Sequence, residues 1–328
     1  MPVMSKRPIV AISRPGMPGD PASRLAPLAE VREWAESWHP SHAELLALSE
    51  GASVLLCVNG DKIDGSFLER SPALRLIALA STGYDATDVA AADRLGVAVT
   101  NTQGTLHETT ADLTFGLIIS ARRRLGEAER YIRAGRWSQD GLDLMLGHDV
   151  YGATLGIVGY GQIGQAVARR ARGFGMTVLA HRRTPGDDEL SRWAPLDELL
   201  RESDIVSLHV PLTAETRHLI GERELRLMKP TATLVNAARG PVVDEVALGR
   251  ALREGWIGSA GLDVQDVEPN PDPNAPLLQL PNCVVLPHIG SATRAAREAM
   301  IGMATDNAVA FLRGEPLITP VGRVRPNS

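Results

Sequence analysis

A glycine-rich turn between an apolar run and an amphipathic stretch places the strongest constraint on the fold. The segment "GIVGYGQIGQAVARR" has Gly159, Gly161 and Gly164 in the spacing GxGxxG, directly after a run suited to a buried strand. In such a turn the first glycine permits the tight bend, the second lets a diphosphate approach the backbone, and the third lets helix and strand pack closely. The sequence therefore predicts a dinucleotide site that also includes Gln162 and Ile163.

Short apolar runs alternate with amphipathic stretches along the chain, which is the pattern of parallel βαβ units. The first hundred residues contain "PIVAIS", "ASVLLCV", "LRLIALAS" and "GVAVTN", and a stronger series from about residue 153 contains "TLGIVG", "MTVLAH", "DIVSLHV", "ATLVNAA", "GSAGLDV" and "CVVLPH". A chain of 328 residues is long enough for two domains. We expect an α/β protein with two doubly wound parallel sheets, Rossmann-like or flavodoxin-like.

The periodic segment between these two series predicts one long helix that joins the domains. It spans about residues 109–137 and carries three consecutive arginines, Arg122 to Arg124. Because runs of charge usually face water, we expect these arginines on a solvated or subunit-facing surface.

Composition excludes several classes of function. The formal charge of −5 gives no basic footprint for nucleic acid, and no apolar stretch is long enough for a signal peptide or a membrane span. Cys57 and Cys283 lie in apolar runs, which predicts buried free thiols and a cytoplasmic protein. No pair of histidines has the spacing of a zinc site, so we predict no metal.

The end of the second strand of the later series indicates which cofactor binds. An NAD site commonly has Asp or Glu there to accept hydrogen bonds from the ribose hydroxyls, whereas this strand ends "VLAHRR". The guanidiniums of Arg182 and Arg183 suit the 2′-phosphate of NADP(H). We therefore prefer NADP(H), with NAD(H) possible; in the alternative interpretation both arginines are exposed loop residues beside an NAD site without its acid.

Three polar segments follow predicted strands, where open α/β sheets bind ligands. "VNAARGPVVDE" supplies Arg239, "AGLDVQDVEP" supplies Asp263 and Glu268, and "LPHIGSAT" supplies His288. Reduction of a 2-keto acid needs a proton donor near neutral pH, a carboxylate that orients it, and a cation that binds the substrate carboxylate. His288, Glu268 and Arg239 could fill these roles, although each could instead be an ordinary loop residue, with Arg239 paired to Asp244.

With these motifs the chain resembles the D-isomer-specific 2-hydroxyacid dehydrogenases, most closely the glyoxylate/hydroxypyruvate reductase branch. The resemblance covers nearly the whole chain through "STGYDATDV", "NTQGTLHETTADL", "GIVGYGQIGQAVARR", "HVPLTAETRHLI", "LVNAARGPVVDE", "AGLDVQDVEPNP", "LPHIGSAT" and "FLRGEP". It implies Arg239, Glu268 and His288 as the catalytic triad, and Thr82 and Gly83 as the loop that receives the substrate carboxylate, together with Arg239 and His288.

The resemblance also implies further cofactor contacts, on the segments that line the nicotinamide and at the start of the long helix. These are Thr110, Pro211, Ala237, Ala238, Asp263 and Gly290.

The same resemblance implies a cofactor domain inserted into a discontinuous substrate domain. The substrate domain would comprise residues 1–101 and 290–328, and the NADP-binding domain residues 102–289. Members of the family are typically homodimers joined through the inserted domain. Asp140 stands where animal members of the branch carry a tryptophan that a neighbouring subunit lends to the pocket, which leaves selectivity for hydroxypyruvate open.

The sequence thus predicts an NADPH-dependent reductase of small 2-keto acids such as glyoxylate and hydroxypyruvate, with His288 as proton donor. Two alternatives stay open. One is a dehydrogenase with the same mechanism for a larger 2-keto acid of phenyl or branched type. The other is a dinucleotide-sensing binding protein, which an intact triad disfavours.

Overall fold

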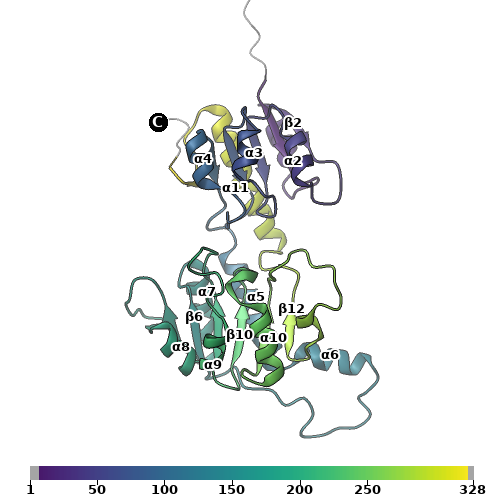
Figure 1. Cartoon of the computed structure of the whole chain (residues 1–328), viewed down its shortest axis with the longest axis vertical. Helices are drawn as coiled ribbons and strands as arrows, with labels where there is room; N and C mark the ends of the chain where they lie inside the picture. Colours follow the sequence, from purple (N-terminus) through teal and green to yellow (C-terminus); the bar gives the residue numbers. More distant parts are fainter. Residues whose placement is uncertain (1–6, 324–328) are drawn as a thin grey trace, which may run out of the picture. The chain divides into compact units, whose positions relative to one another are not determined.

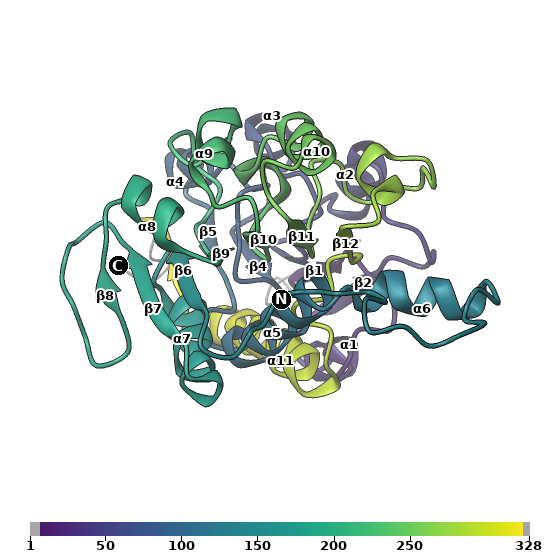
Figure 2. The same cartoon turned by 90° about the horizontal axis from the view of Figure 1, so that it is seen from below.

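The computed structural model describes residues 7–323, and the chain forms two compact units (Figures 1 and 2). Unit 1 runs up to Leu106 and resumes at Ala292, and unit 2 is His107–Ser291. The boundaries expected from the sequence lie a few residues before these divisions. Each apolar run that was expected to form a strand does form one, and the bounds of these strands are given below.

Unit 2 is built on a parallel sheet of seven strands in the order β12-β11-β10-β9-β6-β7-β8. The strands are β6 (Thr154–Val158), β7 (Thr177–His181), β8 (Arg192–Trp193), β9 (Ile205–Leu208), β10 (Thr233–Asn236), β11 (Ser259–Leu262) and β12 (Cys283–Val285). The strand order reverses direction between β6 and β9, and ligands of doubly wound sheets bind outside the carboxyl ends of the strands at such a point.

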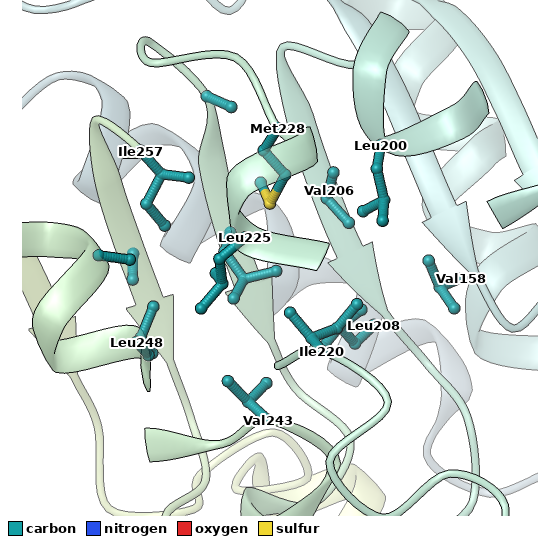
Figure 3. Packing of buried hydrophobic residues seen from close by; sticks show 14 of the residues in the cluster. Val158, Leu200, Val206, Leu208, Ile220, Leu225, Met228, Val243, Leu248 and Ile257 are labelled. Carbon is teal, nitrogen blue, oxygen red and sulfur yellow. The ribbon is translucent and has the colours of Figure 1, made fainter. Parts of the chain in front are cut away.

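Helices cover both faces of this sheet. They are α5 (His107–Arg122), α7 (Gln162–Ala171), α8 (Leu196–Glu202), α9 (Glu222–Leu227) and α10 (Glu245–Glu254). A further helix, α6 (Leu125–Arg133), has no buried residue and belongs to neither layer. Apolar residues of α5 and α7 form one core with the sheet, and those of α8, α9 and α10 form the other. Figure 3 shows this second core, which includes Leu200, Leu225 and Leu248 from the helices and Val206 and Leu208 from β9. Burial on both faces explains why these strands are apolar throughout.

Unit 1 has a smaller sheet in the order β13-β5-β4-β3-β1-β2, parallel except for β13. Its strands are β1 (Ile9–Ile12), β2 (Glu30–Glu33), β3 (Val54–Cys57), β4 (Leu76–Leu79), β5 (Ala98–Thr100) and β13 (Pro320–Val321). The helices are α1 (Pro21–Leu25), α2 (His42–Leu48), α3 (Gly65–Glu69), α4 (Val89–Leu95) and α11 (Arg294–Arg313). α2, α3 and α4 pack on one face, and α1 and α11 on the other.

The expected single long helix is instead two helices, and Arg122 is not on a solvated surface. The chain breaks between α5 and α6 at Arg124, which has a positive φ of 55°. Arg122 is only 6% exposed, and its guanidinium donates to the carbonyls of Asp149 at 2.9 Å and Asp204 at 2.8 Å. The prediction of a solvated surface was wrong for Arg122 because its guanidinium satisfies backbone carbonyls inside unit 2.

Both cysteines are buried and free, as expected: Cys57 in β3 and Cys283 in β12. Between residues 7 and 323, no helix combines the length and apolar character that crossing a bilayer requires.

Candidate active site

The three glycines of the turn after β6 differ in the space around them. Gly159 has a φ of 93°, and a Cβ there would lie 2.6 Å from the carbonyl carbon and oxygen of His209. A Cβ on Gly164 would lie 2.3 Å from the carbonyl oxygen of Gly159. A Cβ on Gly161, by contrast, would meet nothing within 4 Å. Close packing thus excludes side chains at two positions, while the third faces open space.

Helix α7 begins at this open space with its N-terminal N–H groups uncapped. Gly161 is the N-cap residue, so no side chain accepts a hydrogen bond from the N–H groups of the first turn, which includes Gln162 and Ile163. Free N–H groups and the positive end of the helix dipole attract an anion. The turn therefore fits the diphosphate of a dinucleotide.

His209, which sequence reasoning set aside, directly follows β9, the strand that pairs with β6, and its N–H donates to the Val158 carbonyl at 2.7 Å. Burial lowers its pKa to about 3, so the ring is neutral near pH 7, and its Nε2 lies 2.8 Å from the hydroxyl of Ser207. The loop that follows contains Pro211, which is exposed and whose carbonyl accepts a hydrogen bond from the hydroxyl of Thr216 at 2.6 Å.

Arg182 and Arg183 follow β7 and have different surroundings. The Arg182 guanidinium lies 5.1 Å from the centre of the Tyr160 ring and 3.4 Å from the carboxylate of Asp188, and it also donates to the carbonyl of Gly186. Its Nε is buried and has no hydrogen-bond partner. Arg183 is exposed. The structure therefore provides one partly buried guanidinium after β7, next to one exposed arginine.

His288 and Glu268 form a hydrogen-bonded pair at the carboxyl ends of β11 and β12. The Nδ1 of His288 lies 2.6 Å from Oε2 of Glu268, and the backbone N–H of Gln265 donates to Oε1 of Glu268 at 2.7 Å. Burial raises the pKa of Glu268, but these hydrogen bonds and the charges of His288 and Arg239 outweigh it and hold that pKa below its usual range. Glu268 is therefore a carboxylate at neutral pH, fixed on one side by the backbone and on the other by the imidazole.

Asp263 holds the histidine loop in place. It directly follows β11, is 2% exposed, and accepts hydrogen bonds from the N–H groups of Ile289 at 2.8 Å and Gly290 at 2.7 Å. Its carbonyl accepts from the N–H of His288, whose φ of 53° turns the chain sharply. Burial raises the pKa of Asp263 despite the two N–H donors. Sequence reasoning did not anticipate that both carboxylate oxygens bind this loop.

Arg239 begins the turn that follows β10. Asn236, the last residue of β10, braces the turn: its amide donates to the Arg239 carbonyl at 2.8 Å and accepts from the N–H of Ala238 at 3.0 Å. A Cβ on Gly240 would lie 2.0 Å from the backbone of Gln265, so this turn packs directly on the loop that carries Glu268. The ends of β10, β11 and β12 thus gather the predicted triad, and Asn236 and Gln265 are positioning residues that sequence reasoning missed.

The remaining predicted residues of unit 2 lie in this region or next to it. Ala237 and Ala238 form the turn before Arg239, and Ala238 is buried. Thr110, in the first turn of α5, donates from its hydroxyl to the Gly290 carbonyl at 3.2 Å. Within residues 7–323, no group of three or more His, Cys, Asp or Glu side chains could hold a metal ion.

Thr82 and Gly83 belong to unit 1, in the loop that follows β4. The Thr82 carbonyl accepts from the side-chain amide of Asn101 at 2.9 Å, its hydroxyl donates to the Thr102 carbonyl at 3.3 Å, and the Gly83 carbonyl accepts from the Ser81 hydroxyl at 2.8 Å. The loop is thus ordered by its own hydrogen bonds.

Known proteins match this chain along nearly its whole length. The family model described as "D-isomer specific 2-hydroxyacid dehydrogenase, NAD binding domain" matches residues 115–290. A glyoxylate reductase of Korarchaeum cryptofilum is 48% identical over 314 residues, which cover 94% of each chain.

Solved structures agree with this match. A crystal structure of a Thermus thermophilus protein superimposes with a TM-score of 0.89 and 46% identity, covering 95% of this chain and 99% of that one. An NADPH-dependent glyoxylate/hydroxypyruvate reductase from Sinorhizobium meliloti, solved with NADP and malonate, gives a TM-score of 0.87 and 32% identity, with 97% and 98% covered. Together with the fold and the glycine turn, these matches establish that the chain belongs to the D-isomer specific 2-hydroxyacid dehydrogenase family, whose members are NAD(P)-dependent enzymes.

Proposed function

We propose that this enzyme reduces glyoxylate, hydroxypyruvate and related small 2-keto acids to 2-hydroxy acids, with NADPH as the preferred reductant. The observation that carries the proposal is the His288–Glu268 pair, 2.6 Å apart, on the loops next to Arg239. The names of the relatives support the substrate class: one is a glyoxylate reductase, and another is an NADPH-dependent glyoxylate/hydroxypyruvate reductase.

The three side chains divide the work of the reaction. Reduced nicotinamide, when bound, supplies a hydride to the carbonyl carbon of the substrate. Negative charge then develops on the carbonyl oxygen, and His288 donates its proton there from Nε2, since Nδ1 is engaged by Glu268. The Glu268 carboxylate pairs with Nδ1 and fixes the orientation of the imidazole. Arg239 binds the substrate carboxylate and polarises the carbonyl.

The other predicted contacts form part of the proposal. The N–H groups at the start of α7 would bind the diphosphate, and Arg182 with Arg183 would bind the 2′-phosphate. The segments of Thr110, Pro211, Ala237–Ala238 and Gly290 would line the nicotinamide, and the Thr82–Gly83 backbone would receive the substrate carboxylate. In this assignment unit 2 is the cofactor domain and unit 1 the substrate domain.

We also propose a cytoplasmic homodimer. The free thiols of Cys57 and Cys283 suit a reducing compartment. Helix α6 and the loop after it, residues 125–149 and here called the arm, lie beyond β12 at the edge of unit 2 (Figures 1 and 2). The arm exposes several large apolar side chains, which suit an interface with a second copy: Leu125, Ile132, Trp137, Leu142, Leu144 and Leu146. Asp140 lies exposed on it.

The proposal is tested by initial rates of NADPH and NADH oxidation with glyoxylate, hydroxypyruvate, pyruvate and phenylpyruvate at matched concentrations. We expect turnover with the two small substrates and a higher kcat/KM with NADPH. Preference for NADH would overturn the role of Arg182 and Arg183. Activity with phenylpyruvate alone would indicate the larger-substrate alternative, and tight NADPH binding without any turnover would indicate a sensor.

A further inference from the structure

The loop that follows β7 is organised around one carboxylate, Asp188. Its Oδ1 accepts hydrogen bonds from the N–H groups of Leu190 and Ser191, both at 2.9 Å, and from the Ser191 hydroxyl at 3.1 Å. The hydroxyl of Tyr160, inside the glycine turn, donates to the same oxygen at 3.2 Å. Burial acts to raise the pKa of Asp188, yet these donors outweigh it and lower that pKa, so the group is charged at neutral pH.

The second oxygen of Asp188 faces Arg182, but the contact is loose. The Nη1 to Oδ2 distance is 3.4 Å, longer than a good charge-assisted hydrogen bond of about 2.7–2.9 Å. The guanidinium also lies over the Tyr160 ring, and its Nε has no acceptor. Arg182 is therefore held in place and neutralised, but a better-placed anion could replace its partner.

We propose that Asp188 is an internal counter-ion that takes the place of the 2′-phosphate on Arg182 and thereby limits how strongly the enzyme distinguishes NADPH from NADH. This inference rests on the proposed function, in which Arg182 binds the 2′-phosphate. When the ribose carries only a hydroxyl, Arg182 keeps Asp188 and is not left as an unpaired charge, so NADH binds without that penalty. When the ribose carries a phosphate, Asp188 must give up Arg182 and remains beside a dianion, which weakens NADPH binding.

Removal of this one charge should sharpen the preference for NADPH. In Asp188→Asn the side-chain oxygen can still accept from Leu190 and Ser191, so the loop keeps its backbone contacts. We expect the Kd of NADPH to fall by about three- to tenfold and that of NADH to stay within about twofold, the scale of one partly exposed charge pair.

Binding of cofactor fragments isolates the phosphate from the chemistry. Isothermal titration of the full chain with adenosine 2′,5′-bisphosphate and with adenosine 5′-monophosphate compares two ligands that differ in the 2′-phosphate and lack the nicotinamide. Asp188→Asn should tighten only the bisphosphate. The matched control is Asp187→Asn, which also removes one negative charge, but from the preceding residue. The carboxylate of Asp187 accepts a hydrogen bond from the Trp193 N–H at 2.7 Å. This control should leave the ratio of the two affinities unchanged. Thermal unfolding of each variant checks that the fold is retained.

Arg182→Ala tests the assignment of the 2′-phosphate separately from the counter-ion role of Asp188. If it abolishes the discrimination between the two fragments while Asp188→Asn leaves it unchanged or reduces it, the counter-ion role is wrong and the 2′-phosphate assignment stands. If Arg182→Ala leaves the discrimination intact, both the phosphate assignment and the inference built on it are wrong. An equal gain from Asp187→Asn would likewise overturn a specific role for Asp188.

Discussion

The His288 imidazole has one nitrogen engaged and one available. Glu268 occupies Nδ1 at 2.6 Å, so only Nε2 can transfer a proton to a substrate. His288→Ala should lower kcat by about two to four powers of ten, the range for loss of a general acid. The Kd of NADPH, measured by fluorescence titration, should change little because the glycine turn is intact.

The matched control for this variant is His39→Ala, since His39 is an exposed histidine outside both the proposed site and the arm. It should retain the full rate. An unchanged kcat in His288→Ala would place the proton donor elsewhere, and an equal loss in both variants would point to a general effect of histidine removal.

Glu268 links the active site to stability in acid. Its folded-state pKa lies below the ordinary value of 4.5, so the unfolded chain binds a proton there more readily. The pairing therefore stabilises the folded state above about pH 4.5, and this contribution is lost as pH falls through the lower, folded-state pKa.

Urea unfolding across this range tests the linkage. Glu268→Gln should be less stable than the wild type near pH 7, and the difference in unfolding free energy should shrink as pH falls below about 4.5. A difference independent of pH would mean that the stabilisation by Glu268 does not depend on its charge.

At the level of single residues, sequence reasoning identified groups by their place after strands. Arg239, Glu268 and His288 could be placed together this way because the carboxyl ends of parallel strands meet at one edge. The support given by Asn236 and the Gln265 N–H could not, because it depends on which loops pack against each other. Asp188 was missed for the same reason: its partner Tyr160 lies in the glycine turn, on a different strand end.

At the scale of elements, two glycines of the turn between β6 and α7 should respond differently to substitution by alanine. Gly164→Ala should destabilise the protein by about 1–3 kcal/mol, because its Cβ would overlap the Gly159 carbonyl. Gly161→Ala should leave the melting temperature nearly unchanged, because its φ of −81° is allowed for alanine and the space is open. The added methyl would instead obstruct the diphosphate and raise the Kd of NADPH at least about tenfold.

Each variant is the control for the other, since both exchange glycine for alanine within one turn. Thermal unfolding without cofactor measures the first effect and fluorescence titration the second. Equal melting temperatures for the two variants would contradict the packing argument, and undiminished cofactor binding by Gly161→Ala would mean that the diphosphate lies elsewhere.

Helices and strands that bury apolar residues on one face or on both faces could be predicted from the sequence. Elements without such an apolar pattern could not. β2 reads "EVRE" and has no buried residue, and β8 has only two residues, so neither carries a hydrophobic signal. The break between α5 and α6 was missed because the apolar periodicity continues across it, while Arg122 turns inward to backbone carbonyls.

At the scale of the whole molecule, the two sheets follow from the two series of apolar runs, and each has a core on both faces. The insertion of one unit within the other has no signature in periodicity. It was expected only from the resemblance to the family, and the two compact units divide the chain after Leu106 and after Ser291.

The exposed leucines of the arm predict that two copies of the chain assemble through it. Leu142 is fully exposed and Leu146 is 66% exposed, an unfavourable state for two leucines on one short loop unless another surface covers them. We expect sedimentation velocity to give twice the mass of the chain, and Leu142→Glu/Leu146→Glu to shift the protein to the monomer. Val246→Glu is the matched control, because Val246 is 83% exposed on α10, outside the arm. A wild-type monomer, or a double variant that stays dimeric, would show that the arm does not hold two copies together, and dissociation by Val246→Glu would place the interface on α10.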